Sequence, residues 1–255
     1  MNLSLSDWNL LQNYIGEGPI DKAEIVFFGN EFGLAQNNIE NYINFLKRFI
    51  QEGRIVLLGK SINEGFTIYG KDSAPLNSQF VRFCSRFMLA YNNKDDRFLG
   101  ELSKQGETAV NNYITHDLHM SNSSIINYRP LPRPSEDQWI YENVNKDTYL
   151  KSFRISSKYH QFDVNIKPRI ANLIRGFKKP TNPIIIGTGD KWNKQNLFER
   201  IFPDTLFTEI SLKTGKKILI DEKQRIILTD YFDHRTLGLP SLREIFNIVN
   251  DKYLK

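Results

Sequence analysis

Two short, wholly apolar runs decide the fold class expected of this chain. Ile25-Val-Phe-Phe28 is followed by Gly29, and Ile184-Ile-Ile186 is followed by Gly187. Uninterrupted apolar runs are typical of strands buried on both faces, as in a parallel sheet, whereas a strand with one wet face alternates apolar and polar residues. Further strands are predicted at 123–128, 205–212, 217–220 and 225–229.

Amphipathic helical patterns separate these strands. In residues 38–50 the apolar side chains recur every three or four positions, which is the spacing of one helix face. The same spacing predicts helices at 78–91, 166–177, 191–201 and 241–254. Parallel strands need crossover connections, which the first three helices supply. The pattern therefore predicts a three-layer α/β/α sandwich with a central, mainly parallel sheet.

The remaining segments are interpreted as additions to that one sheet. Strand-like runs at 54–59 and 65–70 indicate an insertion-like hairpin near 54–70, and the polar stretch 92–122 indicates a weaker helix with loops. No boundary is marked strongly enough to divide the chain. Residues 1–255 are therefore predicted to form a single α/β domain.

Composition limits the partners and cofactors. The 255 residues carry 34 Lys and Arg against 29 Asp and Glu, a net charge of +5 that suits a polyanionic partner without demonstrating one. The single cysteine, Cys84, excludes an internal disulfide, a cysteine-rich zinc site and a four-cysteine iron–sulfur cluster. The longest apolar runs are far too short to span a membrane, and the first residues do not resemble a secretion signal. A cytoplasmic protein that does not contact membranes is expected.

Chemistry is expected where the strands end. In a doubly wound sheet, ligands bind outside the carboxyl ends of the strands, near the point where the strand order reverses. Four segments that follow predicted strands are therefore candidate ligand-binding segments, and polar and glycine residues gather at each of them: 29–33, 127–134, 187–190 and 230–240.

The first segment, Gly29-Asn-Glu-Phe-Gly33, follows a buried strand. Its glycines allow the backbone to approach a ligand, and its amide and carboxylate suit a bound water or a base edge. The alternative is an ordinary turn with a solvated glutamate. No Gly-Lys-Ser/Thr follows, and the glycine spacing differs from the dinucleotide-binding fingerprint, so neither of those phosphate-binding loops is predicted.

The second and third segments each have two interpretations. Asn127-Tyr-Arg-Pro-Leu-Pro-Arg-Pro134 places Arg129 and Arg133 on a proline-stiffened loop, which suits phosphate contact. The alternative is a polyproline-like surface loop or a ligand for a proline-reading module. Gly187-Thr-Gly-Asp190 precedes a helix whose free N–H groups suit an anion. The favoured interpretation there is that Asp190 caps the helix.

Histidine placement singles out His234. It follows the last predicted strand and precedes a Gly/Pro loop, although a lone histidine is more often structural than catalytic. His116 and His119 lie three residues apart without a second ligand pair, and His160 has no supporting context. No metal site is predicted.

The order of these segments resembles the uracil-DNA glycosylase superfamily. Residues 29–33 stand where the family has Gly-x-x-Pro-Gly, with Phe32 in place of the proline, and Phe32–Asn37 is similar to the single-strand-selective branch. Ser124–Pro130 matches the family's second strand and the Arg-Pro pair that follows it. Asn182–Gly189 matches the third strand. His234–Ser241 matches the histidine-containing loop, with Arg235 where a proline is usual.

The resemblance implies an enzyme that removes uracil or another damaged base from flipped nucleotides of DNA, without a cofactor. It implies that Glu31 or Asn30 positions water, that Asn127 reads the base, and that His234 stabilises charge on the departing base. In an alternative register of the second strand, Ser124 takes the reading role. The resemblance further implies that Gly29, Phe32 and Gly33 surround the base. It implies that four residues contact DNA, with the leucine inserted as a wedge between bases: Arg129, Arg133, Arg235 and Leu237.

Two other functions stay open at this point. The first is a member of the superfamily that binds nucleic acid or a nucleotide without cleaving it, which the altered first and last motifs favour. The second is an unrelated α/β enzyme that acts on a small anionic metabolite.

Overall fold

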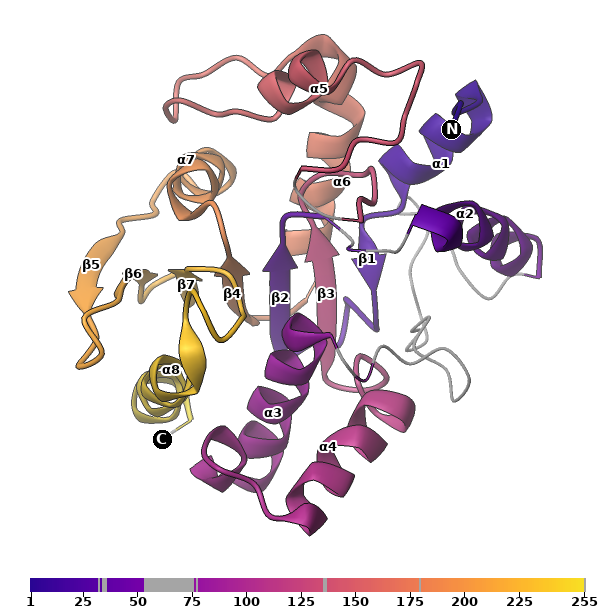
Figure 1. Cartoon of the computed structure of the whole chain (residues 1–255). Coiled ribbons are helices and arrows are strands. Elements are labelled where there is room, and N and C mark those ends of the chain that lie inside the picture. Colours follow the sequence, from indigo (N-terminus) through magenta and orange to yellow (C-terminus); the bar gives the residue numbers. More distant parts are fainter. Residues whose placement is uncertain are drawn as a thin grey trace.

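The computed structural model describes residues 1–31, 33, 36–52, 76, 78–134, 137–178 and 180–254, without the side chains of 36–38. These residues form a seven-stranded sheet with the order β1-β3-β2-β4-β7-β6-β5 (Figure 1). The strands are β1 Gly16–Glu17, β2 Ile25–Gly29, β3 Ser123–Asn127, β4 Ile184–Thr188, β5 Thr208–Ser211, β6 Lys217–Asp221 and β7 Ile226–Thr229.

The centre of the sheet is parallel and its flanks are antiparallel. Strands β3, β2, β4 and β7 run in one direction, with β1 antiparallel to β3, β6 antiparallel to β7 and β5 antiparallel to β6. All residues of the four central strands are buried, which is why their sequences are apolar runs rather than alternating patterns. The prediction of an α/β fold with a mostly parallel sheet is confirmed.

Helices cover both faces of the sheet (Figure 1). Val26 and Phe28 of β2 belong to one core cluster, together with residues of α1, α2, α5, α6 and α7. Ile25 and Phe27 point the other way and pack with α3, α4 and α8. The helices are α1 Leu5–Asn13, α2 Gln36–Gln51, α3 Gln79–Asn93, α4 Lys104–His116, α5 Lys146–Ser152, α6 Lys167–Lys178, α7 Lys191–Ile201 and α8 Gly238–Tyr253. This arrangement is consistent with a three-layer sandwich.

Several elements differ from the predictions. The predicted hairpin near 54–70 falls outside the described residues. The stretch 92–122, predicted as a weaker helix with loops, contains the end of α3, a 3₁₀ helix at Asp96–Leu99 and the 13-residue helix α4. The pattern missed α1, α5 and β1. Strand β1 is fixed by close approach, since a Cβ on Gly16 would lie 1.8 Å from the Ile125 carbonyl oxygen. No helix in the described part of the chain is long and apolar enough to cross a membrane.

Arg169 of α6 ties the first helix to the end of β3. Its guanidinium is fully buried and donates to the carbonyl oxygens of Leu11 (3.1 Å) and Tyr14 (2.6 Å), and to those of Asn127 and Tyr128 (3.1 Å). The carbonyls at a helix end have no partner within the helix, so this side chain satisfies them. Burial lowers the pKa of Arg169 to about 10. Arg169 thereby fixes the backbone that carries Asn127.

Candidate active site at the carboxyl edge of the sheet

The four parallel strands end at one edge of the sheet, and the residues that follow them form a pocket of about 530 Å³. We call it the edge pocket, and its lining includes Asn30, Arg129, Asp190, Tyr231 and Arg235. Strand β3 lies on one side of β2 and β4 on the other, so the strand order reverses at β2. The pocket therefore lies where a doubly wound sheet binds ligands.

Asn30 is held at this edge by a buried lysine. Lys194 of α7 donates from Nζ to Asn30 Oδ1 and to the carbonyl oxygens of Thr188 (2.8 Å) and Gly189 (2.6 Å). These contacts fix which end of the Asn30 amide faces Lys194. A Cβ on Gly189 would lie 3.1 Å from Asn30 Nδ2, and Gly189 has φ of 70°, so both space and backbone favour glycine there. Asn30 therefore presents its amide nitrogen as a donor.

Lys194 carries a strongly perturbed charge. Its side chain is buried among apolar residues of α7 and β2, and its Nζ lies 5.1 Å from the centre of the Phe28 ring. Burial lowers the pKa of Lys194 to about 7, with smaller opposing and reinforcing effects from Asp190, Arg129 and Glu31. The charge of the Lys194 ammonium group, which contacts Asn30 Oδ1, therefore changes near neutral pH.

This pKa predicts a pH-dependent stability. Between pH 7 and 10.5, the ordinary pKa of a lysine, the unfolded chain binds more protons at this lysine than the folded chain. The free energy of unfolding should therefore rise with pH in this range. The slope from this one group is at most about 1.4 kcal/mol per pH unit. Urea unfolding from pH 7 to 9 should show this rise in the wild type and in the exposed control Lys223→Met, and a flatter profile in Lys194→Met. Equal profiles in all three proteins would contradict it.

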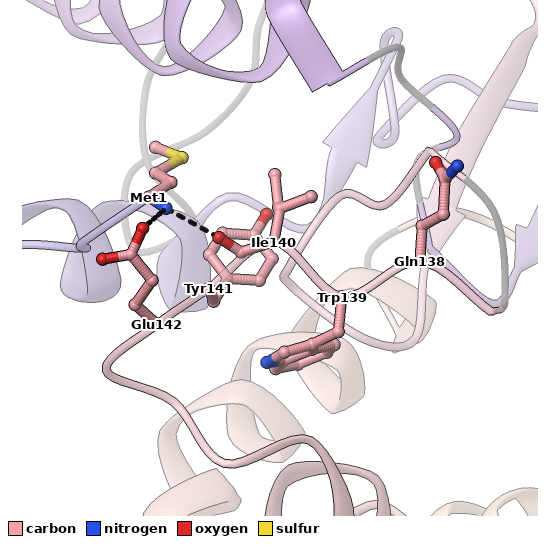
Figure 2. A pocket seen from close by; sticks show the side chains of 6 residues that line it. All are labelled: Met1, Gln138, Trp139, Ile140, Tyr141 and Glu142. Carbon is pink, nitrogen blue, oxygen red and sulfur yellow. Dashed lines mark hydrogen bonds and ion pairs between the residues drawn. The ribbon is translucent and has the colours of Figure 1, made fainter.

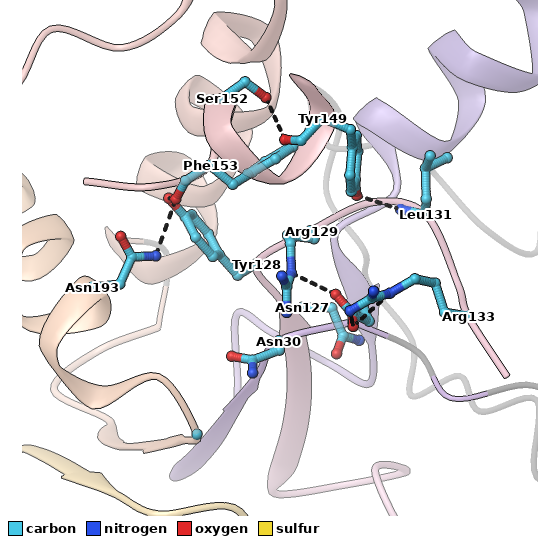
Figure 3. Close-up of polar contacts among 12 residues, drawn as sticks. Asn30, Asn127, Tyr128, Arg129, Leu131, Arg133, Tyr149, Ser152, Phe153 and Asn193 are labelled. Carbon is cyan, nitrogen blue, oxygen red and sulfur yellow. Dashed lines mark hydrogen bonds and ion pairs between the residues drawn. The ribbon is translucent and has the colours of Figure 1, made fainter. Parts of the chain in front are cut away.

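Glu31 does not lie free in the edge pocket. Its carboxylate pairs with Arg129, at 2.5 Å between Nε and Oε2, and with Arg133, which donates to Oε1 from Nε at 2.9 Å (Figure 3). The Glu31 and Arg133 side chains are only 9% and 3% exposed. Charges buried this deeply need each other for neutralisation. Arg133 is thus placed as a partner of Glu31 and not as the predicted phosphate contact, and of the two predicted water-positioning residues Asn30 alone lines the pocket.

Asn127 ends β3 in register with Gly29, the last residue of β2. It is 1% exposed, and its amide nitrogen has no hydrogen-bond partner among the described residues. A Cβ on Gly29 would lie 2.8 Å from Asn127 Oδ1, so glycine makes room for the amide. Thr188 and Thr229 pair across the ends of β4 and β7, and their hydroxyls are also buried without a partner in the described part of the chain. Unsatisfied buried polar groups are rare, and three of them end strands at this edge of the sheet, although none of the three lines the edge pocket.

Ser124 does not lie at the strand end. It pairs with Val26 inside the sheet, three residues before Asn127. The alternative register, in which Ser124 would read the base, is therefore wrong. Phe32 lies outside the described residues, and Gly33 is exposed and bridges to Arg133.

The loop after β7 reaches the same edge. Asp233 accepts from the backbone N–H groups of Arg235 and Thr236, both at 2.7 Å, which holds the turn. His234 is exposed, donates from its backbone N–H to Gln79 Oε1 (3.1 Å), and packs its ring edge-on against Phe83. Arg235 lines the edge pocket, whereas His234 does not border it.

Leu237 corrects one prediction. Its side chain is buried in the core cluster that contains α3, α4 and α8. A leucine packed there contributes to the core, so it cannot act as the predicted wedge between DNA bases. Its position directly before α8 explains the burial, because α8 begins at Gly238 and turns its apolar stripe toward the same cluster.

No family model, curated protein or solved structure matches this chain. The site is therefore defined by its own geometry.

Asp190 also differs from its prediction. It occupies the N-cap position of α7 with φ of 45°, but its side chain makes no capping hydrogen bond. Asp190 instead lines the edge pocket. The carboxylate that was expected to cap α7 therefore faces the edge pocket.

Sequence reasoning missed Lys194, Lys216 and Tyr231, although one of them left a signal. Lys194 lies three, four and seven residues before Leu197, Phe198 and Ile201, on the buried face of α7. A lysine on the apolar stripe of a helix is exceptional unless it is paired. Lys216 lines the edge pocket, and so does Tyr231, whose ring stacks on Phe80 at 5.6 Å.

Two further pockets lie away from this edge. One is formed near the N-terminus by Met1 and residues 138–142, where the terminal ammonium donates to the Ile140 carbonyl (2.8 Å) and pairs with Glu142 (Figure 2). The other surrounds Arg225 and Asn182, which precede β7 and β4 at the opposite end of the sheet. Neither contains a predicted site residue.

His119 is a buried histidine beside the start of β3. Its ring lies 3.1 Å from Ser123 Oγ, and burial lowers the pKa of His119 to about 3. Among the described residues, no group of three His, Cys, Asp or Glu side chains is arranged to hold a metal ion.

Proposed function

We propose that the chain removes a base from DNA, with the target nucleotide flipped into the carboxyl edge of the sheet. The observation that carries this proposal is the buried amide nitrogen of Asn127, which has no partner among the described residues. An asparagine amide offers a donor and an acceptor side by side, which is the complement of a base edge. A bound base would supply the missing acceptor.

The reaction is a hydrolysis at the sugar. Water forms a bond to C1′, the bond from C1′ to the base nitrogen breaks with its electron pair leaving on the base, and the water proton passes to solvent or to the base. The Asn30 amide, fixed by Lys194, is suited to orient that water. His234 lies on the loop after β7 but does not border the edge pocket, so donation toward the charge that develops on the base requires its ring to turn away from Phe83.

Basic side chains around the edge pocket suit the phosphates. Arg129, Lys216 and Arg235 line it, although Arg129 also pairs with Glu31, and of its two aspartates Asp230 is paired with Lys191 at 3.0 Å. Guanidinium groups bind phosphate oxygens through two N–H groups at once. DNA affinity should therefore fall as salt concentration rises.

A base-release assay tests the proposal. Single- and double-stranded oligonucleotides that contain uracil are incubated with the protein and then treated with alkali, which breaks the strand at abasic sites. We expect strand breaks at the uracil position under single-turnover conditions. Intact strands with uracil and with other damaged bases would contradict the proposal.

Binding without cleavage is the second candidate, and one observation favours it. Glu31, which the resemblance places beside the attacking water, is instead paired with two arginines. The same oligonucleotides distinguish the candidates, because a non-cleaving protein would bind them with salt-dependent affinity and leave them intact.

Replacing His234 by alanine should lower the single-turnover rate of base release about a hundredfold, the typical effect of losing one positioned donor. DNA affinity and the melting temperature should change little because the ring is exposed. Arg235→Ala is the matched control on the same loop, and it should weaken binding while the rate at saturation stays close to that of the wild type. An unchanged rate in His234→Ala would remove this residue from the mechanism.

A further inference from the structure

Trp192 is an exposed tryptophan on a fixed part of the fold. Its side chain is 56% exposed in the first turn of α7, whereas Trp8 and Trp139 are packed against Tyr149 in the core. Within the ranges that the structure covers, no ring is stacked on Trp192. The start of α7 is anchored by its neighbour Lys191, which pairs with Asp230 and donates to the Lys217 carbonyl oxygen (2.8 Å).

Trp192 lines a second pocket at the same edge, with a volume of about 430 Å³. We call it the side pocket, and its lining includes Tyr128, Arg129, Arg154 and Asp190. Arg129 and Asp190 also line the edge pocket. The two pockets therefore adjoin, with Arg129 between them.

The side pocket is preformed by hydrogen bonds between its walls. Asn193 of α7 accepts from the Ile155 backbone N–H (2.5 Å) and donates to the Phe153 carbonyl oxygen (3.1 Å), which also accepts from the Tyr128 hydroxyl (Figure 3). Asn196 donates to the Ile155 carbonyl oxygen (2.9 Å). The loop at 153–156 is thus held against α7. A ligand that enters the pocket does not have to order these walls.

The chemistry of the lining selects the kind of ligand. The exposed Trp192 ring shares this pocket with the cationic side chains of Arg129 and Arg154. The rest of the lining mixes polar residues with apolar ones, among them Leu150, Phe153, Ile155, Asp190, Asn193 and Asn196. Aromatic platforms beside cationic groups are the usual way to bind successive bases of single-stranded nucleic acid. Arg129 lies where a phosphate that links two nucleotides would pass from one pocket to the other.

We propose that the side pocket binds the base next to the flipped nucleotide, stacked on Trp192, so that the protein holds a single-stranded segment of at least two nucleotides. This inference rests on the proposed function only in that the edge pocket takes a nucleotide. It adds a second base site and a preference for single strands, since bases in a duplex are not available for stacking on a side chain.

Fluorescence titration of the full chain tests this inference. An unlabelled single strand of about eight thymidine nucleotides, within the usual site sizes, should quench part of the tryptophan emission of the wild type. In Trp192→Ala the quenching should be lost and the Kd, measured by anisotropy with a labelled strand, should rise about ten- to a hundredfold. Trp192→Phe should retain most of the affinity, because phenylalanine still stacks.

Tyr159→Ala is the matched control, because Tyr159 is an exposed aromatic residue, at 81%, that does not border either pocket. The affinity of the Tyr159→Ala protein for the single strand should equal that of the wild type. Wild-type affinity in Trp192→Ala, quenching that persists in that variant, or a wild type that does not bind the strand would each overturn the inference. Base release is measured in a separate assay. Binding that depends on Trp192 without base release would support the base site in the side pocket and refute the proposed glycosylase activity. Base release with binding that does not depend on Trp192 would support the glycosylase activity and refute this base site.

Discussion

Replacing Asn127 by alanine should lower the single-turnover rate of base release by about three orders of magnitude or more. A site built to hydrogen-bond its substrate discriminates strongly, because its buried groups are left unpaired when the partner is removed. The same substitution should change the free energy of unfolding by less than about 1 kcal/mol, since the amide nitrogen gives up no hydrogen bond among the described residues. Rates on uracil-containing single strands and urea unfolding of the same preparation measure both effects.

Ser124→Ala is the control for Asn127, because Ser124 is a buried residue of the same strand whose hydroxyl also has no partner in the described ranges. It should leave the rate of base release unchanged. A loss of stability in Asn127→Ala that matches its loss of activity would indicate a structural residue and contradict the assignment.

Replacing Arg169 by leucine should destabilise the fold by about 3–5 kcal/mol. The substitution leaves the carbonyl oxygens of Leu11, Tyr14 and Tyr128 buried without their donor, and each unsatisfied group costs about 1–3 kcal/mol before neighbouring groups rearrange. Urea unfolding measures this change.

Lys178→Leu provides the comparison for Arg169, because it is exposed in the last turn of the same helix. Its effect should stay within about 0.5 kcal/mol, as is usual for surface positions. A change below 1 kcal/mol in Arg169→Leu would show that water or local movement replaces the lost donors. The anchoring of Asn127 would then need another explanation.

The sequence predicted the centre of the fold better than its margins. Strands β2 and β4 were recognised because both of their faces are buried, which leaves wholly apolar runs. Strand β1 could not be recognised, because two residues form no pattern and the close contact at Gly16 depends on a strand far along the chain. Helix α5 is only seven residues long and carries a single fully buried side chain.

The sequence also predicted which residues meet at this edge, without giving their contacts. The carboxyl ends of parallel strands meet by topology, so Asn30, Arg129 and Arg235 were expected at one edge and line one pocket. The pairing of Glu31 was not visible, since Arg133 is 102 residues away along the chain. The wedge role of Leu237 was implied by the family resemblance, and only the direction of α8 shows that this side chain is buried.

The most direct test is the side-chain amide signal of Asn127 in a ¹⁵N-labelled sample. The ligand is a single-stranded oligonucleotide with one 2′-fluoro-2′-deoxyuridine, whose fluorine slows cleavage, and the signal is assigned by its loss in Asn127→Ala. We expect the Asn127 amide protons to move downfield and to exchange more slowly with water at saturation. Amide signals of Asn127 that stay in place while the strand is bound would contradict it.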